Sequence, residues 1–197
     1  VGSGAGEIAK QLADELGYDL VDKAILQGTL KQYGMTRFGE LYSSPPNLWD
    51  LANSKNLEIV SMLNDTMQAL AHRGRTVILA RGGYVTLGKY ADVLKVRLHA
   101  PFEVRVDRVM EREGFVDRSE AAVRVAADDK ARIKFVERFY GQKWHNESDF
   151  DLAEEWITKA VRMLESKELR SDAQLAKKTK IDPLLLSAID EALELRR

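Results

Sequence analysis

The chain has 197 residues, of which 45% are hydrophobic, so it is long enough to bury a core. Its 30 basic and 31 acidic side chains leave a net charge of -1, which gives no basis for a nucleic-acid or membrane-surface partner. No apolar run reaches the roughly 20 residues of a membrane helix, a signal-peptide pattern is not seen, and cysteine is absent. We therefore expect a cytoplasmic protein.

The first part of the chain alternates helical and strand patterns. A glycine-rich opening loop leads into a helix at residues 7–16, which Gly17 is expected to end. Spacing and composition predict a strand at 18–22 and then helices at 23–34 and 56–74. Residues 35–54 hold two prolines and many polar side chains, which predicts a loop or irregular structure.

The second part continues the alternation. The β-branched run "TVILA" at 76–80 predicts a strand buried on both faces. A further strand is predicted at 93–100, and another short one is expected near "FDLAEEW". Helical patterns cover the ranges 101–114, 118–141, 152–169 and, as an appended pair, 172–197.

Strands alternating with helices predict an α/β fold with a parallel sheet flanked by helices. In such sheets ligands bind at the carboxyl ends of the strands. Three features fall at such ends: the opening loop, "DK" after "YDLV", and "RGG" after "TVILA". A phosphate loop normally follows a strand, so we also expect a first strand before Val1.

The opening "VGSGAGE" has the composition of a phosphate-binding loop. Glycines let backbone amides approach a phosphate, and the N-terminus of the following helix favours an anion. A dinucleotide fingerprint needs a small residue where Glu7 stands, although Asp22 lies near the position of a ribose-binding acid. A glycine-rich turn that only caps the helix is the third interpretation.

The P-loop pattern Gly-x-x-x-x-Gly-Lys-Ser/Thr fits the opening only in part. With Gly6 as its second glycine, Val1 stands at the first glycine and Glu7 at the lysine. Ile8 then stands at the position of the hydroxyl that binds Mg²⁺. The metal ligands are therefore not assigned from the sequence.

Four segments together resemble the cytidylate kinase-like family of P-loop proteins, relatives of the nucleoside monophosphate kinases. They are, in order, "GSGAGEIAKQLADELGYDLVDKAIL", "VILARGGYV", "VRLHAPFEVRVDRVMEREG" and "DDKARIKFVERFYGQKW". The resemblance implies a P-loop domain over residues 1–168 with a mobile helical lid. Residues 169–197 are not covered and form the predicted helical appendage, for which a packing hairpin is favoured over a helix-turn-helix.

The resemblance implies phosphoryl transfer from ATP to a nucleoside monophosphate, with Mg²⁺ required and CMP or dCMP favoured by the family name. The donor phosphates would then contact the opening loop, comprising Gly2, Ser3, Gly4, Ala5, Gly6 and Glu7. The alternatives are a non-catalytic nucleotide-binding or regulatory protein, since Glu7 replaces the lysine, and a kinase of another small acceptor. Homo-oligomer formation is left open.

Arg81 directly follows the strand predicted at 76–80. A guanidinium can bind phosphate through two parallel hydrogen bonds, and the resemblance implies that Arg81 binds the phosphate of the acceptor. Its alternative is an ion pair with a core carboxylate. Arg132, Lys130 and Arg138 lie in the lid-like segment and are candidates for closing over the transferring group. Their alternative is the solvated face of a charged helix.

Asp22 and Lys23 follow the first predicted strand and by analogy lie near the acceptor. Asp22 is nearly as well explained as a helix cap. Asp129 either holds Mg²⁺ through water or pairs with a lid arginine. The arginines on the helix after Pro101, namely Arg105, Arg108 and Arg112, are expected to form surface ion pairs. The tryptophans Trp49, Trp144 and Trp156 are expected to be packing residues.

Overall fold

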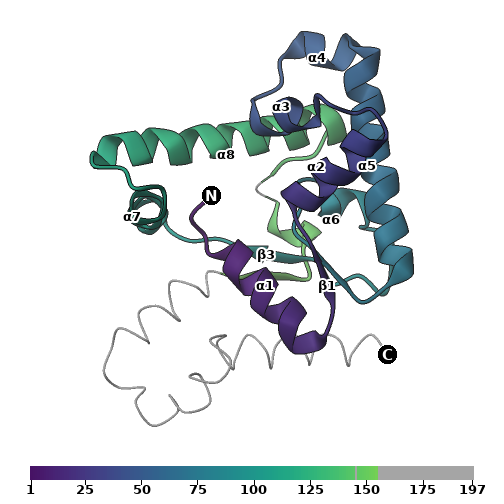
Figure 1. Ribbon diagram of the computed structural model, residues 1–197, viewed down its shortest axis with the longest axis horizontal. Coiled ribbons are helices and arrows are strands. Elements are labelled where there is room, and N and C mark those ends of the chain that lie inside the picture. Colours follow the sequence, from purple (N-terminus) through teal and green to yellow (C-terminus); the bar gives the residue numbers. More distant parts are fainter. Residues whose placement is uncertain (145, 155–197) are drawn as a thin grey trace.

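The computed structural model describes residues 1–144 and 146–154, and within them the protein is a mostly helical α/β structure (Figure 1). The helices are α1 (Ala5–Leu16), α2 (Lys23–Gln32), α3 (Phe38–Ser43), α4 (Leu48–Ala52), α5 (Ser54–Arg73), α6 (Gly83–Thr86), α7 (Phe102–Glu113) and α8 (Arg118–Tyr140). The strands are β1 (Asp19–Val21), β2 (Thr76–Ile78), β3 (Val96–Leu98) and β4 (Leu152–Glu154), and β4 follows a single 3₁₀ turn, Glu147–Asp149.

The strands form two parallel pairs, as alternation with helices predicts. β1 pairs with β2, with Leu20 opposite Val77, and β3 pairs with β4, with Arg97 opposite Ala153. The short strand expected near "FDLAEEW" is thus confirmed as β4. The helix predicted from residue 152 is wrong for its first three residues, which pair with β3, and the rest of that helix and the appendage lie outside the described residues.

Glycines and an aspartate set the ends of the first helices. Gly4 takes a left-handed conformation (φ 80°) before α1, and Gly17 takes another (φ 63°) after it. The Asp22 carboxylate accepts a hydrogen bond from the Ile25 N–H at 3.0 Å and so caps α2. These caps fix where β1 begins and ends, and they place Lys23 immediately after the strand.

The loop predicted over residues 35–54 is wrong, because α3 and α4 lie within it. Phe38 and Tyr42 of α3 are buried in the main core, so tertiary packing stabilises a helix too short to show a clear period. The Asn47 side chain accepts a hydrogen bond from the Asp50 backbone N–H, and the Asp50 side chain accepts one from the Asn47 backbone N–H, which together form a capping box at the start of α4.

The prediction that β2 is buried on both faces is also wrong. Thr76, Val77 and Ile78 are all only partly buried, and the following Leu79 is 36% exposed. Within the described residues β2 pairs with β1 alone, so it lacks the neighbour on its other edge that would cover it.

Helix α8 connects two apolar clusters. Its C-terminal half contributes Phe135 to the main core built by α2, α3 and α5. Its N-terminal half packs Val125 against Val106 and Val109 of α7. Figure 1 shows α8 running from α7 across to α3, beyond the ends of the strands. The middle of α8 is thereby held over the strand ends. None of the helices in the described range is long and apolar enough to cross a membrane.

Candidate active site

The turn after β2 places Arg81 at the carboxyl end of the strand. Gly82 adopts a left-handed conformation (φ 77°), and a Cβ atom there would clash with the ring of Tyr140. A side chain at this position is therefore excluded both by the backbone and by the close approach of α8. Gly82 is the N-cap residue immediately before α6, and Arg81 turns inward with only 6% of its surface exposed.

Tyr42 of α3 holds Arg81 at three points. The Arg81 guanidinium donates to the Tyr42 carbonyl and lies 4.7 Å from the centre of the Tyr42 ring. The Arg81 backbone N–H donates to the Tyr42 hydroxyl at 2.5 Å. Burial lowers the pKa of Arg81, and the neighbouring Tyr42 and Asp128 act against that shift. Helix α3, which the sequence did not predict, therefore orients Arg81, which the sequence did predict as a site residue.

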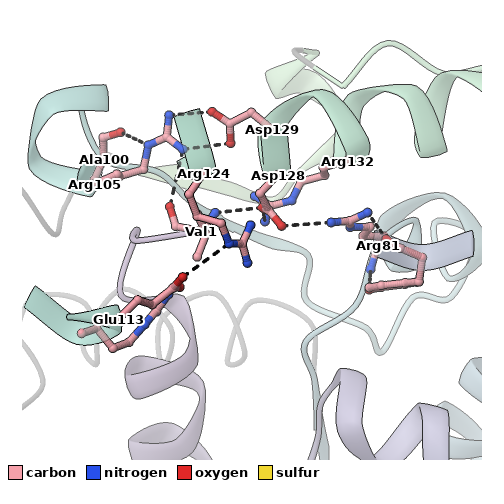
Figure 2. A network of polar contacts seen from close by, with 11 residues as sticks. Val1, Arg81, Ala100, Arg105, Glu113, Arg124, Asp128, Asp129 and Arg132 are labelled. Carbon is pink, nitrogen blue, oxygen red and sulfur yellow. Dashed lines mark hydrogen bonds and ion pairs between the residues drawn. The ribbon is translucent and has the colours of Figure 1, made fainter. Parts of the chain in front are cut away.

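Asp128 of α8 is the centre of the network in Figure 2. Its Oδ1 accepts a hydrogen bond from Arg81 at 3.2 Å, and its Oδ2 accepts one from Arg132 at 2.8 Å. The backbone nitrogen of Val1, at the start of the glycine-rich loop, lies 3.0 Å from the same Oδ2. One carboxylate thus joins the end of β2, helix α8 and the opening loop.

Burial alone would raise the pKa of Asp128, but the charge of Arg132 and further positive groups outweigh burial and leave this pKa below its ordinary value. The carboxylate is 16% exposed and is ionised at neutral pH. Arg81 and Arg132 therefore converge on a permanent negative charge.

Arg132 is held from its other side by an aromatic ring. Its guanidinium lies 5.5 Å from the centre of the Trp144 ring, and Arg97 of β3 lies at the same distance of 5.5 Å from that ring. Arg97 also donates to the Trp144 carbonyl at 3.1 Å. Trp144, for which the sequence predicted only a packing role, therefore links Arg132 of α8 to strand β3.

Two further cations face this network. Lys23 donates to the Ser43 hydroxyl at 2.7 Å and lies 5.9 Å from the Tyr42 ring centre. Burial and then the charge of Arg81 lower the pKa of Lys23. Arg124, one turn before Asp128 on α8, pairs with Glu113 at 3.4 Å (Figure 2). Positive charge therefore exceeds negative charge here.

The other acidic candidates have partners of their own. Asp22 is occupied as the cap of α2, the alternative that the sequence left open. Asp129 forms a two-pronged ion pair with Arg105, with both N···O distances 2.8 Å. The Arg105 side chain is only 15% exposed, so the expected surface pair is wrong for this arginine. Arg112 does form such a pair with Glu113, at 2.7 Å.

The two remaining lid candidates lie apart from the network. Lys130 is exposed and stands two positions after Asp128, which turns it to the opposite side of α8. Arg138 lies ten residues, nearly three helical turns, beyond Asp128, and its Nε is buried without a hydrogen-bond partner in the described part of the chain. The structure brings together Arg81, Lys23 and Arg132 of the residues predicted from the sequence.

The opening loop has the backbone that a phosphate cradle needs. Gly2 and Gly4 both have positive φ (76° and 80°), and Ser3 lies between them. A Cβ atom on Gly2 would lie 2.5 Å from the Arg105 carbonyl oxygen. Gly4 supplies no side-chain cap, which leaves the first N–H groups of α1, at Ala5, Gly6 and Glu7, for another acceptor.

The Glu7 side chain is exposed, and no described residue forms an ion pair with it. No group of three or more potential metal ligands occurs among residues 1–144 and 146–154.

Asp128 is the principal site residue that the sequence reasoning missed. It shares one face of α8 with Val125, three residues before it, and with Arg132 and Phe135, four and seven residues after it. A carboxylate and an arginine at positions where the helix buries apolar side chains were the available signal. Tyr42 carried none, because its segment was interpreted as loop.

The fold and site define an α/β protein whose inward-facing arginines lie between a strand end, a helical arm and a glycine-rich loop. The chain belongs to the cytidylate kinase-like family, whose model matches residues 1–153.

Curated cytidylate kinases are similar to this chain. One from Halobacterium salinarum is 29% identical over 157 residues, covering 77% of this chain and 74% of the relative. One from Methanococcoides burtonii is 30% identical over 140 residues, covering 68% and 73%. An uncharacterized protein from Eubacterium ventriosum has a similar structure, with a TM-score of 0.62, 21% identity, and coverage of 84% of this chain and 94% of that one.

Proposed function

We propose that this protein is a P-loop phosphotransferase that moves the terminal phosphoryl group of ATP to a nucleoside monophosphate, CMP or dCMP being favoured. An oxygen of the acceptor phosphate attacks the γ-phosphorus, the bond to the β–γ bridging oxygen breaks, and ADP leaves with a nucleoside diphosphate formed. Such transfer needs positioning and charge neutralisation more than covalent chemistry.

The observation that carries the proposal is the convergence of Arg81 and Arg132 from separate elements beside the opening loop. Arg81 binds the acceptor phosphate, and Lys23 adds charge beside it. Arg132 neutralises the charge of the transferring group. It thereby takes the place of the P-loop lysine, whose position in this chain is occupied by Glu7. The loop from Gly2 to Glu7 binds the donor phosphates, and their charge would be screened further by Mg²⁺ when the nucleotide carries it. Lys130 and Arg138 join only through movement of α8.

A coupled assay across all nucleoside monophosphates, with ATP and Mg²⁺, tests the reaction and identifies the acceptor. CMP and dCMP are expected to give the highest kcat/KM. Turnover of a different monophosphate would show that the proposed reaction is right and the favoured acceptor is wrong. Absence of turnover with every monophosphate would contradict the proposed reaction.

Glu7 stands at the lysine position of the P-loop pattern and forms no ion pair with any residue that the structure describes, which favours a second candidate, a nucleotide-binding protein without transfer activity. In that case calorimetry detects binding of ATP while no nucleoside diphosphate forms at any Mg²⁺ concentration. Arg132→Ala would then change nucleotide affinity at most.

A further inference from the structure

We propose that Asp128 acts as an internal substitute for phosphate: its carboxylate occupies Arg81 and Arg132, and an incoming phosphate must displace it. The inference rests on the proposed phosphate site formed by these two arginines.

The geometry of Asp128 resembles that of a bound oxyanion. Its two oxygens are divided between two guanidiniums, Oδ1 with Arg81 at 3.2 Å and Oδ2 with Arg132 at 2.8 Å. Guanidinium groups recognise carboxylate and phosphate through the same paired donor geometry. The donors that would bind a phosphate are therefore partly occupied by a side chain of the protein itself.

Burial explains why such a substitute is needed. The Arg81 side chain is only 8% exposed, and a buried charge without a partner is costly. Tyr42 supplies a carbonyl and a ring but no negative charge. Asp128 supplies that charge and also fixes the middle of α8 against the strand end.

A carboxylate in this position opposes phosphate binding, because two anions then compete for the same cations. Asp128→Asn removes the negative charge and nearly keeps the shape. We therefore expect this variant to bind a phosphate anion more tightly and to be less stable on its own. If Asp128 instead oriented Arg81 for phosphate, the same substitution would weaken binding.

The neighbouring Asp129 provides a matched control. It lies on the same helix, its removal as Asp129→Asn changes the net charge equally, and its partner is Arg105 rather than Arg81 or Arg132. Long-range electrostatic effects are thus similar in the two variants. A difference between them reports the local contacts of Asp128.

The test is calorimetric titration with inorganic pyrophosphate in EDTA, without Mg²⁺. Asp128→Asn is expected to bind roughly tenfold tighter than wild type, the order for removing one charge a few ångströms away in a partly solvated site. Asp129→Asn is expected to stay within about threefold of wild type. If wild type binds pyrophosphate and Asp128→Asn binds it equally or more weakly, the inference is overturned while the proposed phosphate site stands. Absence of binding by both wild type and Asp128→Asn overturns the inference and the phosphate site.

Thermal melting provides a second readout that does not require a stable variant. Asp128→Asn should melt below wild type, and pyrophosphate should raise its melting temperature by more than it raises that of wild type. If the variant is unfolded alone, the anion should restore its helical circular dichroism. An equal rise in both proteins, or a variant that stays unfolded in saturating pyrophosphate, contradicts the inference.

Discussion

Replacing Arg81 by methionine tests how the site is built, because methionine keeps the apolar stem and removes the guanidinium. The variant loses the bond to the Tyr42 carbonyl and the ion pair with Asp128 at 3.2 Å. Breaking a buried ion pair by removing one partner costs about 3–5 kcal/mol. Asp128 keeps Arg132 at 2.8 Å and is 16% exposed, so its carboxylate is not left alone. We expect the lower end, about 3 kcal/mol less unfolding free energy.

The measurement is urea denaturation followed by circular dichroism. Arg73→Met is the control, because Arg73 also pairs with an aspartate, Asp19 at 2.6 Å, but both side chains are more than half exposed (58% and 69%). Exposed pairs contribute about 0–1 kcal/mol, so this variant should unfold nearly like wild type. If Arg81→Met and Arg73→Met unfold at the same urea concentration, the account of Arg81 as a buried, charge-paired residue is refuted.

Three further predictions follow from named contacts. Trp144→Leu removes the ring beside Arg132 and should lower kcat roughly threefold to thirtyfold with little change in monophosphate affinity, as a cation–π contact implies; in steady-state kinetics the exposed Trp49→Leu should behave like wild type. Because the folded-state pKa of Asp128 is lowered, the ionised carboxylate stabilises the fold above the unfolded pKa of about 4, and this stabilisation is lost as pH falls through the folded value. The difference in unfolding free energy between wild type and Asp128→Asn should thus be constant near neutrality and shrink below about pH 4. A difference that grows toward acid pH contradicts this. Glu7→Lys should tighten ATP binding roughly tenfold in calorimetry by adding a cation at the start of α1, whereas Glu15→Lys at the other end of that helix should not.

Local signals in the sequence predicted much of the fold. Gly17 ends the first helix as expected, the helix predicted over 56–74 ends at Arg73 with Gly74 as its cap, and the alternation of patterns correctly predicted parallel strands. The loop predicted over residues 35–54 was wrong, because Phe38 and Tyr42 form a helix that is stabilised by packing against α2 and α8 rather than signalled by local periodicity.

The candidate site was predicted in part. Arg81 stood out because an arginine closing an apolar strand needs a reason to be there. The sequence left two interpretations open, a phosphate clamp and a core ion pair, and the structure contains the ion pair in a position suited to the clamp. Asp128 lies among many charges in α8, where only its register with Val125 and Phe135 distinguishes it from solvent-facing neighbours.

Single-turnover transfer from ATP to CMP, in wild type and in Arg132→Ala, tests the central claim most directly. Wild type should form CDP, and Arg132→Ala should slow this step roughly 10²–10³-fold while ATP affinity stays within about threefold, because the arginine acts mainly in the transition state. Equal rates in the two proteins would contradict the role of Arg132. Failure of wild type to phosphorylate CMP or any other nucleoside monophosphate would contradict the account as a whole.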